Sequence, residues 1–242
     1  MVPEDARAQA SSLAYWLVMP AAGVSSRMQA GGDACPKQYL PLAGRTVIEH
    51  ALAPFIDDMH CAGIVVALHA EDHWFASLAV AKHAKVHQTV GGATRRDSVL
   101  AGLTALSRQV LPQDHWVWVH DAARPCIRRV DIERLKVALS SHPAGALLSV
   151  RVSDTLKRSA QGDLVASTVP RDDMWRALTP QAFRLGALTE ALIACPAATD
   201  ESSAMEFTGA SPRLVAGEAD NIKVTVPSDL FLAEHILREM SR

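Results

Sequence analysis

The sequence predicts an α/β fold with a mostly parallel central sheet. Short apolar runs alternate with segments of helical periodicity between residues 15 and 150. Strands and helices that alternate at this spacing are typical of parallel sheets with helical crossovers. A chain of 242 residues can bury a core without help from a disulfide or a metal. We therefore expect one domain over residues 1–242, with residues 1–12 as a flexible leader.

Five buried strands are predicted from the apolar runs, at residues 15–19, 63–68, 85–90, 116–119 and 145–150. Helices are predicted where apolar residues recur three and four apart, at residues 46–55, 72–81, 97–107, 131–140 and 185–194. Thr46 is expected to cap the first of these helices. Residues 220–226 are predicted as a last strand, and residues 228–240 as a terminal helix capped by Ser228.

The pattern changes after residue 150. Residues 149–158 alternate with the period of a strand, Gln161-Gly162-Asp163 reads as a turn, and residues 164–171 are extended again. This predicts a polar, projecting hairpin at about 150–173. Because an isolated hairpin is only marginally stable in water, it should pack on something. The pattern leaves open whether that is a second subunit or the body of its own chain.

Composition excludes several classes of protein. The chain has 24 Lys+Arg and 26 Asp+Glu, a net charge of −2, which argues against a general binder of nucleic acid. No run of about 20 apolar residues predicts a membrane span, and the acidic start is unlike a signal peptide. The four cysteines form no Cys-x-x-Cys pair, which argues against a zinc or disulfide scaffold. We expect reduced thiols and a cytoplasmic protein.

The first candidate site is the loop after the first strand, Pro20 to Met28. In open α/β sheets, ligands bind beyond the carboxyl ends of the strands. The small residues of this loop let backbone amides approach a polyphosphate, and Arg27 supplies a positively charged fork. The loop matches neither the Walker A pattern nor G-x-G-x-x-G. Lys37 follows in a second loop, and its charge suits phosphoryl or nucleotidyl transfer.

Three further segments carry candidate residues. Gly91-Gly92 and Ser98 surround a strand-to-helix turn that could admit a base or ribose, or could be only a tight turn. Asp121 follows the fourth strand and is well placed to hold Mg²⁺ on a nucleotide phosphate, with Arg124 nearby. His120 is interpreted as structural, because Mg²⁺ prefers oxygen ligands. Lys223 and Thr225 share one face of the last predicted strand, which suggests an anion contact or a protected sheet edge.

Taken in order, these segments resemble a known family. The motifs are P-A-A-G-x-x-x-R-M, C-P-K-Q-Y, G-G-x-x-R-x-x-S-V, V-H-D-A-A-R-P, D-T-L-K-R, A-L-T-P-Q, T-D-E and A-D-N-I-K-V-T. This set resembles the 2-C-methyl-D-erythritol 4-phosphate cytidylyltransferases from about Tyr15 to the end of the chain. The resemblance implies a Rossmann-like nucleotidyltransferase fold with a projecting β-arm. It also implies Mg²⁺-dependent transfer of a cytidylyl group from CTP to 2-C-methyl-D-erythritol 4-phosphate, in non-mevalonate isoprenoid biosynthesis.

The resemblance also implies roles for individual residues. The catalytic set would be Arg27, Lys37 and Lys223. The nucleotide would be bound by Ala21, Ala22, Gly23, Gly92, Ser98, Asp121 and Ala122, with Asp121 also holding the metal. The alcohol phosphate would be bound by Arg124, Thr155, Arg171, Thr179, Thr199 and Thr225. Members of the family form homodimers in which the arm reaches the neighbouring site, so Thr155 and Arg171 would act across the interface.

Two departures and three alternatives accompany this interpretation. Ser25 stands where the family loop usually has a second glycine, and Ala93 stands where some relatives have an acid. A cytidylyltransferase for another alditol phosphate, such as ribitol 5-phosphate, would share the fold and the nucleotide site. A regulatory protein that binds nucleotides without turnover is disfavoured by the retained charged residues. A fusion with a further pathway enzyme is not expected, because the sequence ends after the terminal helix.

Overall fold

The computed structural model of the chain describes residues 13–23, 35–109 and 111–240. Its centre is a seven-stranded sheet in the order β11-β7-β10-β6-β1-β4-β5. The strands are β1 (Tyr15–Ala21), β4 (Cys61–Leu68), β5 (Val86–Val90), β6 (Trp116–Val119), β7 (Ala146–Arg151), β10 (Trp175–Arg184) and β11 (Arg213–Ala216). Only β10 runs against its neighbours β6 and β7. The predicted α/β fold with a mostly parallel sheet is confirmed.

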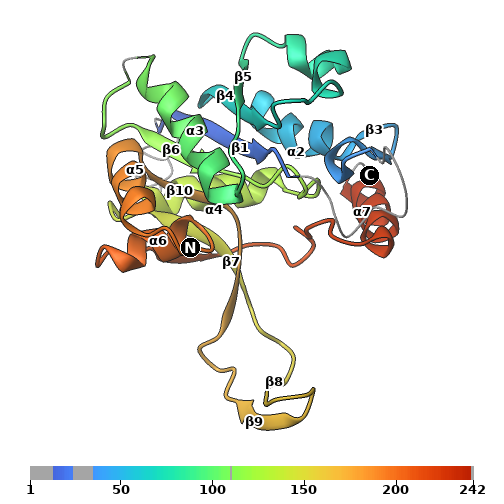
Figure 1. Ribbon diagram of the computed structural model, residues 1–242, viewed down its shortest axis with the longest axis vertical. Coiled ribbons are helices and arrows are strands. Elements are labelled where there is room, and N and C mark those ends of the chain that lie inside the picture. The colour runs from blue at the N-terminus through green and yellow to red at the C-terminus, as the bar shows by residue number, and fades with distance from the viewer. Residues whose placement is uncertain (1–12, 24–34, 110, 241–242) are drawn as a thin grey trace.

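Helices cover both faces of this sheet (Figure 1). They are α2 (Val47–Ile56), α3 (Arg95–Ser107), α4 (Arg129–Leu139), α5 (Leu185–Ala194), α6 (Glu201–Phe207) and α7 (Pro227–Met240). Thr46 caps α2 as predicted, and Glu49 completes a reciprocal capping box with it. Two short strands, β2 (Pro41–Leu42) and β3 (Arg45–Thr46), and the 3₁₀ turn η1 (Lys37–Tyr39) lead into α2.

Three predicted elements differ from the structure. The helix expected at residues 72–81 is two 3₁₀ turns, η2 (Phe75–Ser77) and η3 (Ala79–Lys82), because Leu78 between them is extended. The strand expected at residues 220–226 is a loop outside the sheet, whose Val224 amide donates to the Ala123 carbonyl. The terminal helix begins at Pro227, and the carboxylate of Asp229, not Ser228, accepts the amide before the helix.

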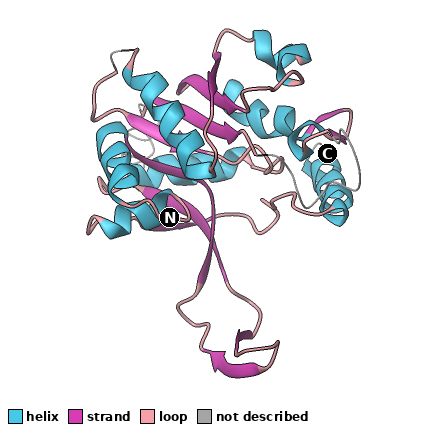
Figure 2. Ribbon diagram, viewed as in Figure 1, coloured by secondary structure: helices cyan, strands magenta, loops and turns pink. Residues whose placement is uncertain are grey.

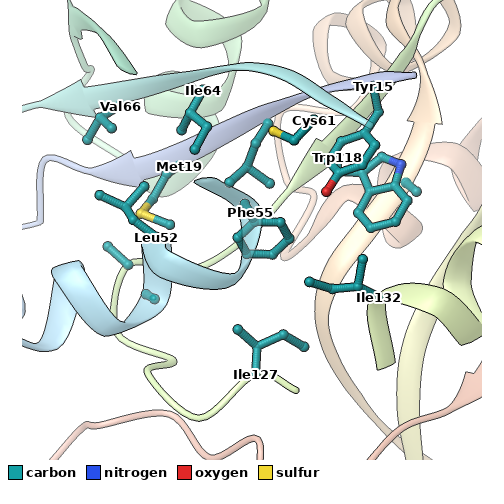
Figure 3. Close-up of a cluster of buried hydrophobic side chains, with 14 of the residues drawn as sticks. Tyr15, Met19, Leu52, Phe55, Cys61, Ile64, Val66, Trp118, Ile127 and Ile132 are labelled. Atoms are coloured by element: carbon teal, nitrogen blue, oxygen red, sulfur yellow. The ribbon is translucent and has the colours of Figure 1, made fainter. Parts of the chain in front are cut away.

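The core forms where side chains alternate along the central strands. On β1, Leu17 and Met19 face one apolar layer and Val18 faces the other. Tyr15 stacks on Trp118 of the adjacent strand with ring centroids 4.0 Å apart. Figure 3 shows these aromatic rings beside Phe55 of α2. Parallel pairing of β1 with both β4 and β6 therefore puts the carboxyl ends of all three strands at one edge of the sheet.

The predicted hairpin is a projecting arm between β7 and β10. Figure 2 shows the chain leaving the body through these strands and ending in a small antiparallel pair. That pair is β8 (Leu156–Ser159) and β9 (Val165–Val169), and the turn between them has positive φ at Gly162 and Asp163. Leu164 and Val165 at its tip are mostly exposed. The arm thus points away from its own body (Figure 1), and its packing on a second subunit stays a prediction.

None of the described helices combines the length and the apolar character that a membrane crossing requires.

Candidate active site

A pocket opens at the carboxyl edge of the sheet, where the loops after β1, β5 and β6 meet. Its walls are formed by residues 20–23, 37–38, 92–95, 98, 121–123 and 223. The structure therefore brings together all the residues that were predicted to bind the nucleotide, and two of the predicted catalytic residues. The first group is Ala21, Ala22, Gly23, Gly92, Ser98, Asp121 and Ala122, and the second is Lys37 and Lys223. Arg27, the third predicted catalytic residue, and Ser25 lie outside the described residues.

Gly91 and Gly92 allow the loop after β5 to sit close to its neighbours. A Cβ atom on Gly91 would lie 2.7 Å from the Cβ of Ala22, and one on Gly92 would lie 2.3 Å from the Cβ of Asp97. The glycines are thus required by close packing of the protein itself. Ser98 is buried; its hydroxyl accepts the Gly92 amide and donates to the Thr94 carbonyl. Contacts of Gly92 and Ser98 with a cytosine remain a prediction.

Lys37 is held at the pocket by the residues that follow it. The side chain of Gln38 donates to the Ala21 carbonyl at 2.9 Å, which ties η1 to the end of β1. The hydroxyl of Tyr39 donates to Asp72 at 2.6 Å. Both side chains are buried, so the backbone of the turn has two fixed anchors. Gln38 was not singled out from the sequence, although it adjoins the predicted lysine.

Asp121 is the electrostatic centre of the pocket. One oxygen accepts from Arg95 Nε at 2.9 Å, and the other lies 2.9 Å from Lys223 Nζ and 3.6 Å from Arg124 Nε. Burial alone would raise the pKa of this carboxyl, but Arg95, Lys223 and Arg124 together hold that pKa well below its usual range. Asp121 is therefore a permanent negative charge in a positively charged surrounding.

Arg95 links Asp121 to a second carboxylate. Its two terminal nitrogens form a bidentate pair with Glu201 at 2.7 and 2.9 Å, and the Glu201 side chain is completely buried. Burial acts to lower the pKa of Arg95, but Glu201 and Asp121 outweigh it and raise the pKa above its usual value. Neither residue was assigned a role from the sequence, although each belongs to a motif quoted above, G-G-x-x-R and T-D-E.

His120 and Thr179 form a buried scaffold behind Asp121. The Thr179 hydroxyl accepts the Asp121 amide at 3.1 Å and lies 3.0 Å from His120 Nδ1, while His120 Nε2 lies 3.1 Å from the Arg124 carbonyl. Burial lowers the pKa of His120 to about 4, so the ring is neutral, with Nε2 donating and Nδ1 accepting. The structural interpretation of His120 is confirmed. Thr179 is buried with it, and its predicted contact with substrate stays a prediction.

Arg124 is largely buried beside this scaffold. Its Nη1 donates to the Asn221 carbonyl at 2.7 Å, and the Asn221 side chain donates in turn to the Thr179 carbonyl at 2.8 Å. Its Nε, by contrast, is buried without a hydrogen-bond partner within the described chain. Burial lowers the pKa of this arginine. The nearest anion to this Nε is the Asp121 carboxylate at 3.6 Å, and the predicted contact of Arg124 with a substrate phosphate stays a prediction.

Comparison with known proteins decides the family. Residues 15–239 match the family model described as 2-C-methyl-D-erythritol 4-phosphate cytidylyltransferase. The protein of that name from Ectopseudomonas mendocina is 50% identical over 223 residues, which cover 90% of this chain and 94% of the relative. Its counterpart from Pseudomonas paraeruginosa is 49% identical over 222 residues, with the same shares covered. The chain belongs to this family.

Solved structures of cytidylyltransferases agree with the assignment. A 4-diphosphocytidyl-2C-methyl-D-erythritol synthase superposes with a TM-score of 0.81 at 33% identity, covering 93% of this chain and 99% of the other. The cytidylyltransferase from Francisella tularensis gives 0.79 at 35% identity, with 92% and 99% covered. The predicted Rossmann-like nucleotidyltransferase fold is confirmed, and the family match includes both the pocket and the arm.

None of the six residues predicted to bind the alcohol phosphate lies in the pocket wall, and two of them, Arg124 and Thr179, are buried behind Asp121. Thr155 and Arg171 are exposed on the arm, and Arg171 donates to the Ser153 carbonyl at its neck. Thr199 is exposed in an adjoining hollow on the far side of the Arg95–Glu201 pair. The Thr225 hydroxyl donates to Asp229 at 2.8 Å, from a loop where a strand was predicted. Their roles in binding stay predictions.

Asp121 fits a metal that is shared with a nucleotide. Among the described residues, no cluster of three or more His, Cys, Asp or Glu side chains could enclose a metal ion. Mg²⁺ on nucleotides commonly takes only one or two carboxylates, with phosphates and water completing its shell. The ionised oxygens of Asp121, on the wall of the pocket, are hard donors of this kind. Within the described residues, Asp121 could therefore supply one ligand to such a metal, and nucleotide phosphates and water would supply the others.

Proposed function

We propose that the pocket around Asp121 carries out the reaction of this family, the transfer of a cytidylyl group from CTP to 2-C-methyl-D-erythritol 4-phosphate. The products are 4-diphosphocytidyl-2-C-methyl-D-erythritol and pyrophosphate, within non-mevalonate isoprenoid biosynthesis. The observation that carries the proposal is the convergence of Lys37, Arg95 and Lys223 on one pocket at the carboxyl edge of the sheet. The family assignment supplies the substrates.

The chemistry joins two anions, so the site must first neutralise charge. A phosphate oxygen of the alcohol phosphate attacks the α-phosphorus of CTP, and the bond to the pyrophosphate leaving group breaks. No covalent bond to the protein is needed, so positioning and electrostatic stabilisation account for most of the rate. We assign Lys37 and Arg27 to the charge that develops on the α-phosphate. We assign Lys223 and Arg124 to the incoming phosphate, because both lie beside Asp121.

We also propose that the reaction uses Mg²⁺ held by Asp121. Bound there, the ion would neutralise nucleotide phosphate oxygens. The protein's own part is to keep the Asp121 carboxylate ionised and oriented. Arg95 donates to the carboxylate, and the Thr179 hydroxyl accepts the backbone amide of Asp121. Ala21, Ala22 and Gly23 would present backbone amides to the triphosphate. Gly92 and Ser98 would lie against the cytosine, and Ala122 against the nucleoside.

We propose further that the chain works as a homodimer through its arm at about 150–173. Support comes from the exposed apolar residues Leu164 and Val165 at the tip of an arm that does not pack on its own body. In such a dimer Thr155 and Arg171 of one subunit would bind the alcohol phosphate in the other, while Thr179, Thr199 and Thr225 would act from the subunit that holds the pocket. The four cysteines are all free thiols, which supports a reducing compartment such as the cytoplasm.

Pyrophosphate release tests the reaction. The purified chain is given CTP and Mg²⁺ with either 2-C-methyl-D-erythritol 4-phosphate or ribitol 5-phosphate. We expect turnover with the first and at most a trace with the second. Turnover that is equal or better with ribitol 5-phosphate would contradict the substrate assignment, and no turnover with either would leave a nucleotide-binding protein without transferase activity.

Mixed subunits test the shared site. Arg171→Ala and Lys37→Ala subunits are each expected to be nearly inactive alone. Mixed and re-equilibrated, they should recover activity, because one of the two sites in each mixed dimer combines an intact pocket with an intact arm. Sedimentation velocity should show a dimer for all samples. A dimer without recovery would contradict the contribution of the arm to the neighbouring site, and a monomer would contradict the dimer itself.

A further inference from the structure

The side chain of Arg95 uses every nitrogen of its guanidinium to join two carboxylates. Nε donates to Asp121 at 2.9 Å, while Nη1 and Nη2 donate to Glu201 at 2.7 and 2.9 Å. A planar fork can make this arrangement, and a lysine ammonium cannot. Since the Glu201 side chain is fully buried and that of Asp121 nearly so, solvent competes little with either contact.

Glu201 is itself fixed to the central sheet. It is the first residue of α6, whose cap Asp200 accepts from the Gln181 side chain at 2.9 Å. The same side chain of Gln181 accepts the Ser202 amide at 2.8 Å. Gln181 lies on β10 opposite Val119, two residues before Asp121. Arg95 therefore connects Asp121 to a support that is anchored in the same pair of strands.

Asp121 then offers its second oxygen to the pocket. Lys223 approaches that oxygen at 2.9 Å and Arg124 at 3.6 Å, whereas Arg95 holds the first oxygen from behind. Without Arg95 the carboxylate could rotate, and both oxygens would be open to the two remaining cations. We infer that Arg95, braced by Glu201, is a positioning residue that fixes the Asp121 carboxylate and thereby the place of Lys223. The inference rests on the proposed function of this pocket.

Arg96 provides a matched control. It is the next residue of α3 and has a similarly buried side chain, and its Nε donates to the Leu192 carbonyl at 2.8 Å. Like Arg95 it ties α3 to the helical layer formed by α5 and α6, but it reaches neither Asp121 nor the pocket wall. A loss caused merely by a loosened α3 should therefore appear in Arg96→Lys as well as in Arg95→Lys.

The decisive experiment is a double-mutant cycle between Arg95→Lys and Asp121→Asn. kcat and the two KM values are measured for parent, both single variants, the double variant and Arg96→Lys. Arg95→Lys should lower kcat about tenfold, the size usual for residues that orient an active carboxylate, with a smaller change in KM for the alcohol phosphate. In the Asp121→Asn background the same substitution should cost less than about twofold, because the group it positions is gone. Arg96→Lys should retain the parent kcat.

The inference would be overturned if Arg95→Lys lowered kcat by the same factor in the parent and in the Asp121→Asn background. An equal loss of kcat in Arg96→Lys would overturn it as well. Arg95→Lys could unfold the chain by leaving the buried Glu201 carboxylate without its partner. The double variant Arg95→Met/Glu201→Leu avoids this, since apolar replacement of both partners of a buried ion pair often preserves stability. It should melt near the parent temperature and still have the reduced kcat; parent-like kcat would overturn the inference. If the parent transfers no cytidylyl group, the proposed function fails. The same variants are then compared by their affinity for CTP, measured by calorimetry, in place of kcat.

Discussion

Lys223 Nζ lies 2.9 Å from the carboxylate of Asp121, where the loop after β6 meets the loop before α7. The two partners differ in exposure, since the lysine side chain is 38% exposed and the aspartate 8%. The carboxylate is therefore fixed and the ammonium can move. Asp121 would still be paired with Arg95 if Lys223 moved toward a phosphate oxygen in the pocket. This difference in exposure is consistent with the proposed role of Lys223, in which the ammonium binds the incoming phosphate.

Replacement of Lys223 should affect the rate more than the binding of CTP. Lys223→Met keeps most of the unbranched side chain but removes the charge that we assign to the incoming phosphate. We expect kcat to fall by about a hundredfold or more, as for other preorganised donors, with KM for CTP changed less. Steady-state kinetics with both substrates varied measures the split. Lys82→Met, at an exposed position on η3, is the control and should be unchanged; a Lys223→Met enzyme with parent kcat would refute the assignment.

A side chain at Gly92 should displace the loop that faces the nucleotide. The Cβ of Gly92→Ala would meet the Cβ of Asp97 at 2.3 Å, so the loop or the start of α3 must shift. We expect KM for CTP to rise about tenfold or more, because small misplacements of a binding group are costly. Gly217→Ala, whose Cβ would meet Leu148 at 3.5 Å, is the matched control and should bind CTP normally. Equal KM values for the two variants would show that the loop adapts.

His120 should make stability depend on pH. In the folded chain burial lowers its pKa to about 4, whereas in the unfolded chain it is about 6.5. Below that upper value the unfolded state binds a proton that the folded state does not. The contribution of His120 to the free energy of unfolding should therefore fall by up to about 1.4 kcal/mol per pH unit between about pH 6 and 4. Denaturant titrations across this range measure the slope.

His120→Gln isolates this contribution, since glutamine still has an amide to donate to the Arg124 carbonyl. As the pH falls below about 6, the free energy of unfolding of the parent should decrease relative to that of the variant. Asp131, whose pKa burial raises to about 6, titrates in the opposite direction in both proteins. The comparison between parent and variant therefore cancels it. Parallel slopes would mean that His120 does not stay neutral in the folded chain.

Lys136 should stabilise the fold without serving the pocket. Its fully buried ammonium lies 2.8 Å from Asp58 and 2.9 Å from Glu133, at the amino edge of the sheet. Lys136→Met leaves the Asp58 carboxylate buried beside Tyr15 without its cation, and we expect a loss of about 3 kcal/mol in unfolding free energy. Glu133→Gln removes the mostly exposed partner and should cost less than about 1 kcal/mol. Urea titration measures both losses. At temperatures below the melting range, kcat of both variants should match that of the parent. A Lys136→Met chain as stable as the parent would contradict this role.

Periodicity was sufficient to predict the sheet where strands are buried on both faces. The runs that became β1, β4 and β6 are almost wholly apolar, and such runs follow from the parallel, helix-covered sheet itself. β10 was missed because its buried half includes the polar residues Thr179 and Gln181, which form the scaffold behind the site. Residues 220–226 alternate like a strand, yet they form a loop that places Lys223 in the pocket wall and Asn221 against Arg124.

The parts of the candidate site that lie in the loops directly after strands could be predicted from the sequence. The residues after β1, β5 and β6 are neighbours because parallel strands end at one edge, and this follows from the predicted topology. The pairing of Arg95 with Glu201 depends on the position of α6, because Glu201 is its first residue. This helix has seven residues, and no periodicity in the sequence predicted it. Nothing in the spacing of two residues so far apart indicates that they form a buried pair. Thr155 and Arg171 are a different case, since their predicted site lies on a second subunit.

The most direct test of the account is transfer of the label from α-phosphorus-labelled CTP to 2-C-methyl-D-erythritol 4-phosphate by the parent and by Asp121→Asn. The parent should place the label in 4-diphosphocytidyl-2-C-methyl-D-erythritol, with one pyrophosphate released per label transferred. Asp121→Asn should fold, as judged by circular dichroism, and transfer the label at least about a hundredfold more slowly. Label transfer at the parent rate by a folded Asp121→Asn chain would contradict the claim that this carboxylate organises the site.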